Sequence, residues 1–337
     1  MRQTAFTMPD GTAVDLLTIS AGGYQAKILA LGASIADLIV PVAGAGRSVV
    51  LGLADYADYV EQGRHMGAVA GRCANRIAAG TFTLDGKSYQ LPLNERGVTH
   101  LHGGNMGFGR RVWTVEMASE TRVELSLDAV DGEEGYPGHV RARCVYSLIP
   151  EGVLRIALTA DTTAPTLVNL ATHSYFNLAG SQTILDHTLT LAAEHYTPVD
   201  ERLIPTGEIA AVAGTGYDFR KPSRIGEQRA KTPTGFDHNF AVAGTPSADP
   251  RFTARLASPT GDLALDIWST EPGVQFYDGQ YLPDTDGFRG RKGNQHAGCC
   301  LEPQRFPDAI NHPNFPGAVL RPGEVYDTTT VFRFPKI

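Results

Sequence analysis

The sequence is poor in cysteine, and the few cysteines lack the spacing of disulfide frameworks or metal sites. Its 337 residues include 4 cysteines, Cys73, Cys144, Cys299 and Cys300, and no C-x-x-C pair occurs. Small disulfide scaffolds and zinc modules need denser and more regular cysteines. We therefore expect free thiols in a reducing compartment, and we place the protein in the cytoplasm.

Excess positive charge and long apolar runs are also lacking. The formal net charge is −7, which disfavours binding to phosphate backbones and to anionic lipid. No apolar run is as long as a membrane span. We therefore expect no nucleic-acid partner and no membrane partner. The amino terminus has no apolar segment followed by a cleavage site, so we expect no secretory signal.

The common cofactor and nucleophile motifs are missing. There is no G-x-G-x-x-G, G-x-x-x-x-G-K-[ST], H-E-x-x-H or G-x-S-x-G, which argues against phosphate cradles, zincin helices and a serine nucleophile. One weak metal hypothesis stays open. His100 and His102, two apart on a predicted strand, would face the same side and hold zinc with His173 or Glu302. Our expectation is no cofactor and no metal.

What the sequence does contain is alternation of apolar and polar residues with period two. Residues 123–127, 140–148 and 154–160 each place apolar side chains on one face, which is typical of strands with one buried side. Asp85-Gly86 and Glu151-Gly152 separate strand-like segments and predict hairpin turns. The 37 glycines and 21 prolines fit the many turns that an all-β protein needs.

Segments with a helical period are few and short. The two candidates run from Leu53 to Gln62 and from Ser223 to Ala230, and we expect surface loops from Asp131 to Gly138 and from Ala243 to Pro250. No internal repeat or charged linker divides the chain. We predict an all-β fold, a large antiparallel β-sandwich with few short helices, formed as one domain over residues 1–337.

The most polar stretch within an apolar run is N-L-A-T-H-S-Y-F-N-L-A-G, residues 169–180. Burying so many hydrogen-bonding groups is costly unless each has a partner. The run therefore indicates a polar pocket in which His173 carries protons beside Tyr175 and Phe176. Short runs elsewhere hold further candidates: Asn75 and Arg76, His100 and His102, Asp237 and His238, Gln275, and Glu302 and Gln304.

Each candidate also has a purely structural interpretation. A lone histidine in a strand is more often a core residue than a catalyst. Arg76 can pair with a carboxylate under a loop, Glu302 can cap a turn, and Asp237 with His238 can form a loop pair. Function is favoured because imidazole, carboxylate, guanidinium and amide groups recur in apolar and glycine-rich runs, not on charged faces.

Taken together, these runs resemble the aldose 1-epimerase (galactose mutarotase) family. In chain order the resemblance is carried by G-R-C-A-N-R-I-A-A-G-T-F-T-L-D-G, L-H-G-G-N-M-G-F, D-G-E-E-G-Y-P-G, T-H-S-Y-F-N-L-A-G, Y-T-P-V-D-E-R-L-I-P-T-G-E-I, Y-D-F-R, F-D-H-N-F, P-G-V-Q-F-Y and L-E-P-Q-R-F-P-D-A-I-N. The resemblance implies a supersandwich with an open concave face that holds a small aldose. Monomer and homodimer both stay open.

The resemblance also implies roles for single residues. Glu302 matches the general base, His173 the general acid, and His102 a histidine that assists near the ring oxygen. The residues implied to bind the sugar are Asn75, Arg76, Tyr175, Asp237 and Gln275.

These residue types suit the interconversion of aldose anomers. One group must take the proton from the C1 hydroxyl while another gives a proton to the ring oxygen, and reclosure reverses both transfers. A carboxylate at Glu302 and an imidazolium at His173 would serve, each worth roughly 10²–10⁴ in rate. A neutral polyol also needs paired donors and acceptors, which Asn75, Arg76 and Asp237 supply.

Two other functions stay open. A hexose-6-phosphate 1-epimerase would need a basic cluster for its dianion, and the run with Arg289, Arg291 and Lys292 is the one candidate, although we expect it to be a solvated loop. A non-catalytic sugar-binding module would not need an acid and a base, yet both are present here.

Overall fold

The computed structural model describes residues 1–61 and 65–335, and strands dominate it. Within these residues the only α-helix is α1 (Ile225–Arg229), accompanied by four 3₁₀ turns, η1 (Ala57–Tyr59), η2 (Phe108–Arg110), η3 (Glu133–Gly135) and η4 (Ala309–Asn311). The prediction of an all-β fold with few short helices is confirmed. No helix of the described part has the length and apolar character needed to cross a membrane.

Both predicted helical segments turn out shorter than expected. Leu53 to Gln62 contains only η1, and its last residue, Gln62, lies outside the described residues. Ser223 to Ala230 is divided between β21 (Ser223–Arg224) and α1. Isolated helices of one or two turns are not stable by themselves because nucleation is unfavourable, so the packing of neighbouring strands decides how far they extend.

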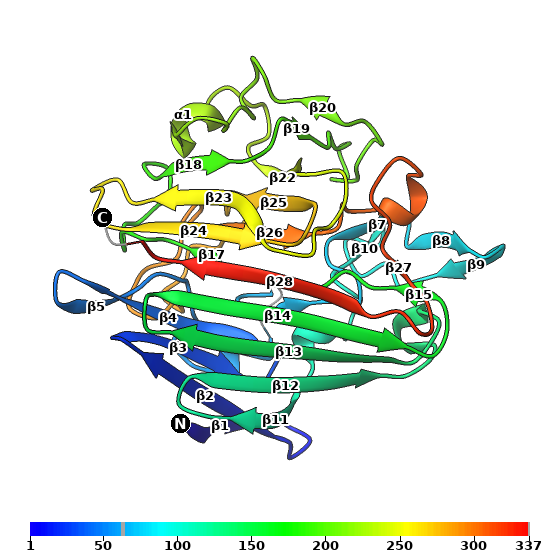
Figure 1. Cartoon of the computed structure of the whole chain (residues 1–337), viewed down its shortest axis with the longest axis horizontal. Coiled ribbons are helices and arrows are strands. Elements are labelled where there is room, and N and C mark those ends of the chain that lie inside the picture. Colours follow the sequence, from blue (N-terminus) through cyan, green and yellow to red (C-terminus); the bar gives the residue numbers. More distant parts are fainter. Residues whose placement is uncertain (62–64, 336–337) are drawn as a thin grey trace.

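A nine-stranded antiparallel sheet is the largest layer, and its long strands lie side by side across the view (Figure 1). Its order is β11 (Thr114–Ala118), β12 (Arg122–Ala129), β13 (Val140–Ile149), β14 (Val153–Thr162), β28 (Tyr326–Arg333), β24 (Ala264–Ser269), β23 (Arg251–Ala257), β18 (Thr188–Leu191) and β21. The period-two segments of the sequence are β12, β13 and β14, and the predicted buried faces are buried.

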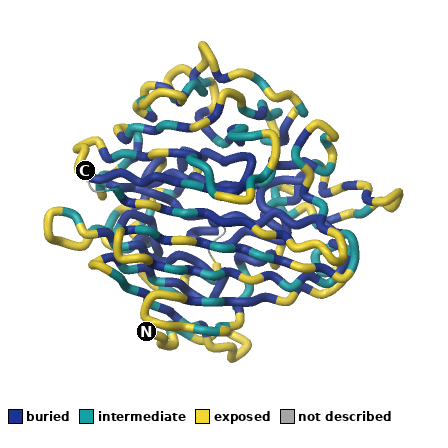
Figure 2. The backbone as a smooth tube through the Cα atoms, viewed as in Figure 1, coloured by how far each residue is buried: buried dark blue, intermediate teal, exposed yellow. Residues whose placement is uncertain are grey.

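A five-stranded sheet from the amino-terminal part packs beside this layer. Its order is β1 (Arg2–Thr7), β2 (Ala13–Ala21), β3 (Tyr24–Leu29), β4 (Ser34–Val42) and β5 (Ala45–Ser48). Strands β2 and β3 contact β12 and β13, and the Tyr146 hydroxyl on β13 donates to the Ala33 carbonyl at 2.7 Å. The two sheets therefore share one apolar core, seen as the dark central strands of Figure 2.

The third sheet has six strands, and it carries most of the candidate residues. Its order is β17 (Tyr175–Phe176), β26 (Cys299–Gln304), β25 (Gly273–Tyr277), β22 (Asp237–Ala241), β19 (His195–Tyr196) and β20 (Ala210–Ala211). One face packs toward the nine-stranded sheet, where the Phe176 ring lies 5.2 Å from the Phe332 ring of β28. The polar candidate side chains lie on the opposite face of this sheet.

Short ladders complete the fold and hold the loops around that face. They pair β6 (Val69–Ala70) with β16 (Ala171–Thr172), β7 (Arg76–Ala78) with β10 (Thr99–Leu101), β8 (Thr81–Leu84) with β9 (Lys87–Gln90), and β15 (Thr166–Leu167) with β27 (Val319–Leu320).

The predicted turns and loops are confirmed. Asp85 and Gly86 join β8 to β9 with φ of 50° and 78°, as a two-residue type I′ turn requires. Glu151 and Gly152 lie in the turn between β13 and β14. Residues 131–138 connect β12 to β13, and residues 243–250 connect β22 to β23.

Candidate active site

Strand register gathers the candidate side chains on one face of the six-stranded sheet. Gln275 lies opposite Glu302, and Asp237 lies opposite Tyr277. Side chains of directly paired residues share a face, and residues two apart on one strand share it as well. Cys300, Glu302 and Gln304 on β26 therefore project with Gln275, Tyr277 and Asp237, whereas Cys299, Leu301 and Phe276 turn into the core.

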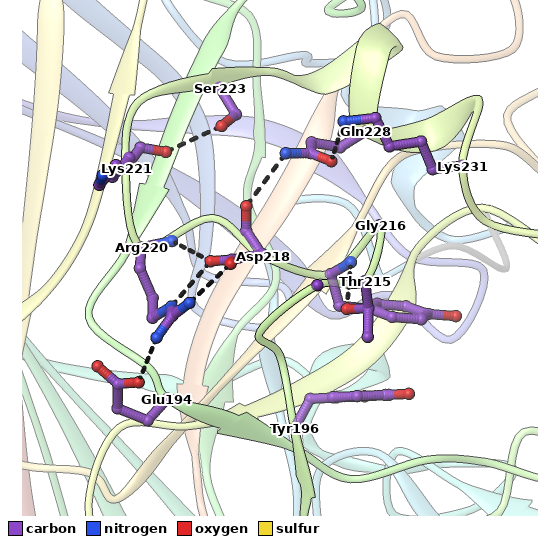
Figure 3. A pocket seen from close by; sticks show the side chains of 12 residues that line it. Glu194, Tyr196, Thr215, Gly216, Asp218, Arg220, Lys221, Ser223, Gln228 and Lys231 are labelled. Carbon is purple, nitrogen blue, oxygen red and sulfur yellow. Dashed lines mark hydrogen bonds and ion pairs between the residues drawn. The ribbon is translucent and has the colours of Figure 1, made fainter.

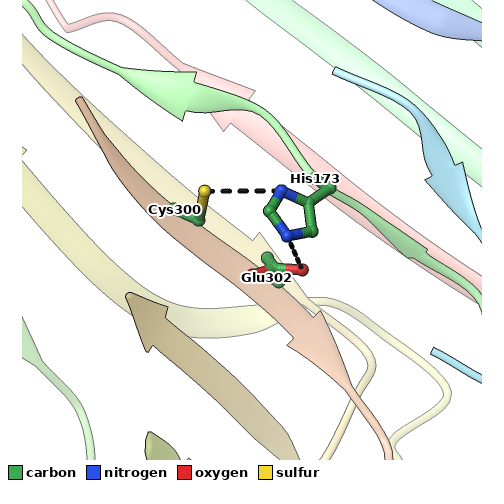
Figure 4. A group of neighbouring side chains, drawn as sticks. All are labelled: His173, Cys300 and Glu302. Carbon is green, nitrogen blue, oxygen red and sulfur yellow. Dashed lines mark hydrogen bonds and ion pairs between the residues drawn. The ribbon is translucent and has the colours of Figure 1, made fainter. Parts of the chain in front are cut away.

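His173 and Glu302 face each other across this surface (Figure 4). His173 lies between β16 and β17, and its Nε2 is 3.7 Å from the Glu302 Oε2. The Cys300 Sγ lies 3.5 Å from the other ring nitrogen, Nδ1. Solvent reaches only 6% of His173 and 2% of Glu302. A carboxyl and an imidazole so close and so dry can exchange a proton through a small bound ligand.

Burial shifts both groups away from their charged forms. It lowers the pKa of His173 to about 4. A hydrogen bond with the residue's own backbone and the Asp237 charge raise this pKa, whereas the Arg76 charge lowers it. Burial also raises the pKa of Glu302 well above its usual value, and the nearby Asp237 charge adds to this while Arg76 opposes it. Without sugar, His173 is therefore neutral at pH 7. The sequence left this resting state open, and the exclusion of water from the ring favours the neutral form.

Two hydrogen bonds in opposite directions hold His102 against Asn75. The Asn75 N–H donates to the His102 Nδ1 at 3.1 Å, and the His102 N–H donates to the Asn75 carbonyl at 2.9 Å. Because Nδ1 accepts, the proton of the neutral ring is on Nε2. Gly103 follows with φ of 87°, and a Cβ there would lie 1.8 Å from the Gly71 carbonyl oxygen, so only glycine fits the turn behind His102.

The His102 ring lies 5.1 Å from the His173 ring, edge to face. Burial lowers its pKa well below the usual value, helped by His65 and His173. His102 is thus a neutral donor beside the His173 ring.

Arg76 is fixed by two carboxylates, as its structural interpretation predicted. Its Nε and Nη2 donate to Glu95 at 2.7 and 2.8 Å, and its Nη1 lies 3.4 Å from the Asp237 Oδ2. Burial opposes its charge, but Asp237 and Glu95 outweigh burial and raise the pKa of Arg76. The Gln275 amide donates to the Asp237 Oδ1 at 2.7 Å. Arg76, Asp237 and Gln275 form one rigid row of donors and acceptors.

Aromatic rings border the pair on one side. The Tyr175 ring lies 5.1 Å from the His173 ring and 6.1 Å from the Tyr277 ring. Phe176 and Phe276, by contrast, are core residues with no solvent exposure.

Two residues of the site were missed by sequence reasoning. Glu95 stands in the turn-like run L-N-E-R-G, which looks like an ordinary loop, and its bidentate contact with Arg76 becomes visible only in space. The His65 ring lies 4.5 Å from the His102 ring at an interplanar angle of 49°, and its Nδ1 is buried without a hydrogen-bond partner in the described structure. The only sign of His65 in the sequence was its position ten residues before the candidate Asn75.

The structure also rules out the zinc hypothesis that the sequence left open. Strand β10 ends at Leu101, and His102 has φ of 50°, so His100 and His102 do not share a strand face. Both ring nitrogens of His100 are engaged, Nδ1 with the Pro92 carbonyl at 2.8 Å and Nε2 with the Tyr136 hydroxyl at 2.7 Å. The zinc hypothesis built on this pair is therefore wrong.

Two of the purely structural interpretations do not hold either. Glu302 lies in a strand and caps no turn, and Asp237 and His238 lie in β22, with the His238 ring packed 4.7 Å from Tyr217.

The expectation of a solvated basic run holds for Lys292, which is exposed and paired with Asp284, but not for the two arginines. Arg289 donates to the carbonyls of Ala36 and Leu53 at 3.2 and 2.9 Å, and Arg291 donates to the Ser48 carbonyl at 3.2 Å. These guanidinium groups attach their loop to the β4–β5 region, so they do not form a free phosphate site.

Two hollows lie beyond Asp237. The smaller, about 360 Å³, is lined by Asp237 and His238 together with Arg96, Asp200 and Glu201. The larger, about 890 Å³, shares Tyr196 and Tyr217 with it and contains none of the predicted residues. Arg220 in the larger hollow is held by Asp218 at 2.8 Å and Glu194 at 2.7 Å (Figure 3), so its charge is already matched.

Comparison with known proteins agrees with this geometry. A family model for aldose 1-epimerase matches residues 15–333. The chain is 44% identical to galactose mutarotase of Bos taurus over 328 residues, which cover 95% of this chain and 94% of that protein. It is 33% identical to aldose 1-epimerase of Escherichia coli K12 over 344 residues, which cover 99% of each.

Solved structures give the same result. An aldose epimerase homologue from C. elegans superposes with a TM-score of 0.90 at 29% identity, covering 96% of this chain and 100% of that one. Galactose 1-epimerase from Lactobacillus acidophilus superposes with a TM-score of 0.87 at 28% identity, covering 100% and 98%.

Fold, site and relatives define an isomerase that acts on sugars. More specifically, the chain belongs to the aldose 1-epimerase family.

Proposed function

We propose that this protein interconverts the α and β anomers of free aldoses such as glucose or galactose, with Glu302 and His173 as its acid/base pair. The observation that carries the proposal is the 3.7 Å approach of His173 Nε2 and Glu302 Oε2 on a polar sheet face. The names of the relatives support the same reaction. The pair needs no cofactor for this chemistry.

The reaction uses the two protonation states of a pair that holds one proton. In ring opening, Glu302 takes the C1 hydroxyl proton while His173 gives its proton to the ring oxygen, which leaves Glu302 protonated and His173 neutral. Rotation about C1–C2 and the reverse transfers give the other anomer. The resting pKa directions favour the second state, so sugar binding must move the proton to His173 or the two groups must begin in exchanged roles.

The surrounding groups would bind and orient the sugar. We assign His102 to the ring oxygen, where its Nε2–H donates, and Asn75, Arg76, Asp237 and Gln275 to the sugar hydroxyls. Tyr175 would pack on an apolar face of the ring. Because Arg76 and Asp237 are already fixed by Glu95 and Gln275, little ordering is lost on binding.

The rate should show a bell-shaped dependence on pH. Below about pH 4 His173 is protonated as well, so the pair holds two protons. We therefore expect kcat/KM to fall as the pH decreases through that value. On the alkaline side kcat/KM falls as the pH increases through the raised pKa of Glu302, because the pair then holds no proton. Polarimetry across this range checks the profile, after correction for the spontaneous reaction. A rate independent of pH would contradict the one-proton pair.

Polarimetry on fresh α-glucose, α-galactose and α-glucose 6-phosphate tests the function against its alternatives. We expect fast catalysis with the free aldoses and weak catalysis with the phosphate, because the hollow beside Asp237 sets Arg96 against Asp200, Glu201 and Asp237. The excess of negative side chains in this hollow repels a dianion. Preference for the phosphate would favour the hexose-phosphate epimerase. Sugar binding without rate enhancement would favour a binding module.

Three further features belong to the proposal. Residues 1–337 would form one domain, in line with the core shared by the sheets. The four thiols are free and buried, which fits a cytoplasmic location. Nucleic acid and membranes are not proposed as partners, and the assembly would be a monomer or homodimer.

A further inference from the structure

We propose that Cys300, His173 and Glu302 form an inhibitory site for a soft divalent cation such as Zn²⁺. The binding site stands on its own geometry, whereas the inhibition rests on the proposed acid/base function of the pair. A bound cation would occupy both groups that move protons.

The three side chains converge because of strand periodicity. Cys300 and Glu302 are two apart on β26 and project from the same face, while His173 approaches from the segment between β16 and β17 (Figure 4). Taking one ligand atom from each residue, all three atoms lie within 4.8 Å of one another. All three residues are buried, so an ion would have to enter past the polar side chains of this sheet face.

The separations are close to those of a zinc site. Bonds of about 2.3 Å to sulfur and about 2.0–2.2 Å to nitrogen and oxygen put tetrahedral ligand atoms roughly 3.3–3.6 Å apart. The Sγ–Nδ1 separation is 3.5 Å and the Nε2–Oε2 separation is 3.7 Å. These two contacts use different ring nitrogens, and one ion can take only one of them. The ligand atoms lie within 4.8 Å of one another, so the most distant pair would have to approach by about 1 Å to complete the set.

The ligand types determine which cation fits. Thiolate and imidazole favour zinc over Mg²⁺ and Ca²⁺, which prefer oxygen ligands. Three protein ligands leave the fourth tetrahedral position open toward the pocket for water or a sugar hydroxyl. On binding, the S–H bond of Cys300 breaks, an S–Zn bond forms, and the proton goes to the buffer. No oxidation or reduction occurs.

The neighbouring charges permit a cation here. Arg76 is the nearby positive group, and its charge is balanced by Glu95 and Asp237. His102 and His65 add imidazole rings 5.1 and 6.2 Å from the His173 ring, and as neutral groups they do not repel an ion.

The experiment titrates the metal-free full-length protein with Co²⁺, a spectroscopic substitute for Zn²⁺. We expect a thiolate-to-cobalt charge-transfer band that saturates at one ion per chain and is abolished by Zn²⁺. Cys300→Ala should lose the band and bind Zn²⁺ more than about 100-fold more weakly, since even loss of an outer partner of a metal ligand costs about 10–100-fold. Cys144→Ala, which removes a buried thiol of β13 far from the pocket, is the matched control and should keep the band.

Kinetics supply the second measurement. Zn²⁺ should lower kcat for galactose, because it occupies both proton-transfer groups, and EDTA should restore kcat. A Cys300→Ala protein that keeps the band, or a wild-type protein without a band, would overturn the site. A band without inhibition would overturn the inhibitory role. If Cys300→Ala does not fold, Glu302→Gln tests the same site through weakened Zn²⁺ binding. Because the band does not depend on catalysis, failure of the proposed isomerase activity would be seen separately.

Discussion

Replacing Glu302 by glutamine is expected to lower kcat for anomer interconversion by about 10²–10⁴-fold, the usual contribution of one positioned proton-transfer group. Glutamine has nearly the same shape, so the register with Gln275 and the fold should persist. The amide neither accepts the C1 hydroxyl proton nor returns it. In energy the loss is about 3–5 kcal/mol of transition-state stabilisation.

Polarimetry with fresh α-galactose measures this change, and circular dichroism shows that the variant is folded. Glu271→Gln is the matched control, because Glu271 is also a buried carboxyl but is bound by Arg305 at 3.1 Å and Tyr326 at 2.9 Å. That variant should keep its activity. Full activity in Glu302→Gln would refute the assignment of Glu302 to proton transfer.

Replacing His173 by asparagine is the second large effect we expect, again a loss of about 10²–10⁴ in kcat. Asparagine has no group at the position of Nε2, which faces Glu302, so nothing exchanges protons with the ring oxygen. The acid limb of the pH profile near pH 4 should vanish as well, because it reports the protonation of His173. His139→Asn, at a half-buried histidine that pairs with Asp128, should change neither quantity.

The double variant separates a cooperating pair from two independent groups. Residues that act as one unit give losses that do not multiply. We therefore expect Glu302→Gln with His173→Asn to be hardly slower than either single variant. A loss equal to the product of the single losses would show that the two residues act in separate steps.

Sequence reasoning located the strands well and the contacts less well. The alternation in residues 140–148 and 154–160 predicted β13 and β14, because every second side chain of a strand with one buried face is apolar. The helical segments were overestimated, because a short apolar period is satisfied equally by a 3₁₀ turn and a strand end. His100 looked like a partner of His102, and only the end of β10 at Leu101 separated them.

The sequence by itself determined the all-β class, the hairpin at Asp85-Gly86 and the inventory of candidate proton-transfer and sugar-binding residues. These follow from local properties: side-chain period, turn chemistry and residue type. Only the tertiary structure decided that Glu302 lies 3.7 Å from His173, that Glu95 fixes Arg76, and that burial leaves His173 neutral. Such facts depend on long-range register and on the exclusion of water, which no short segment of the chain encodes.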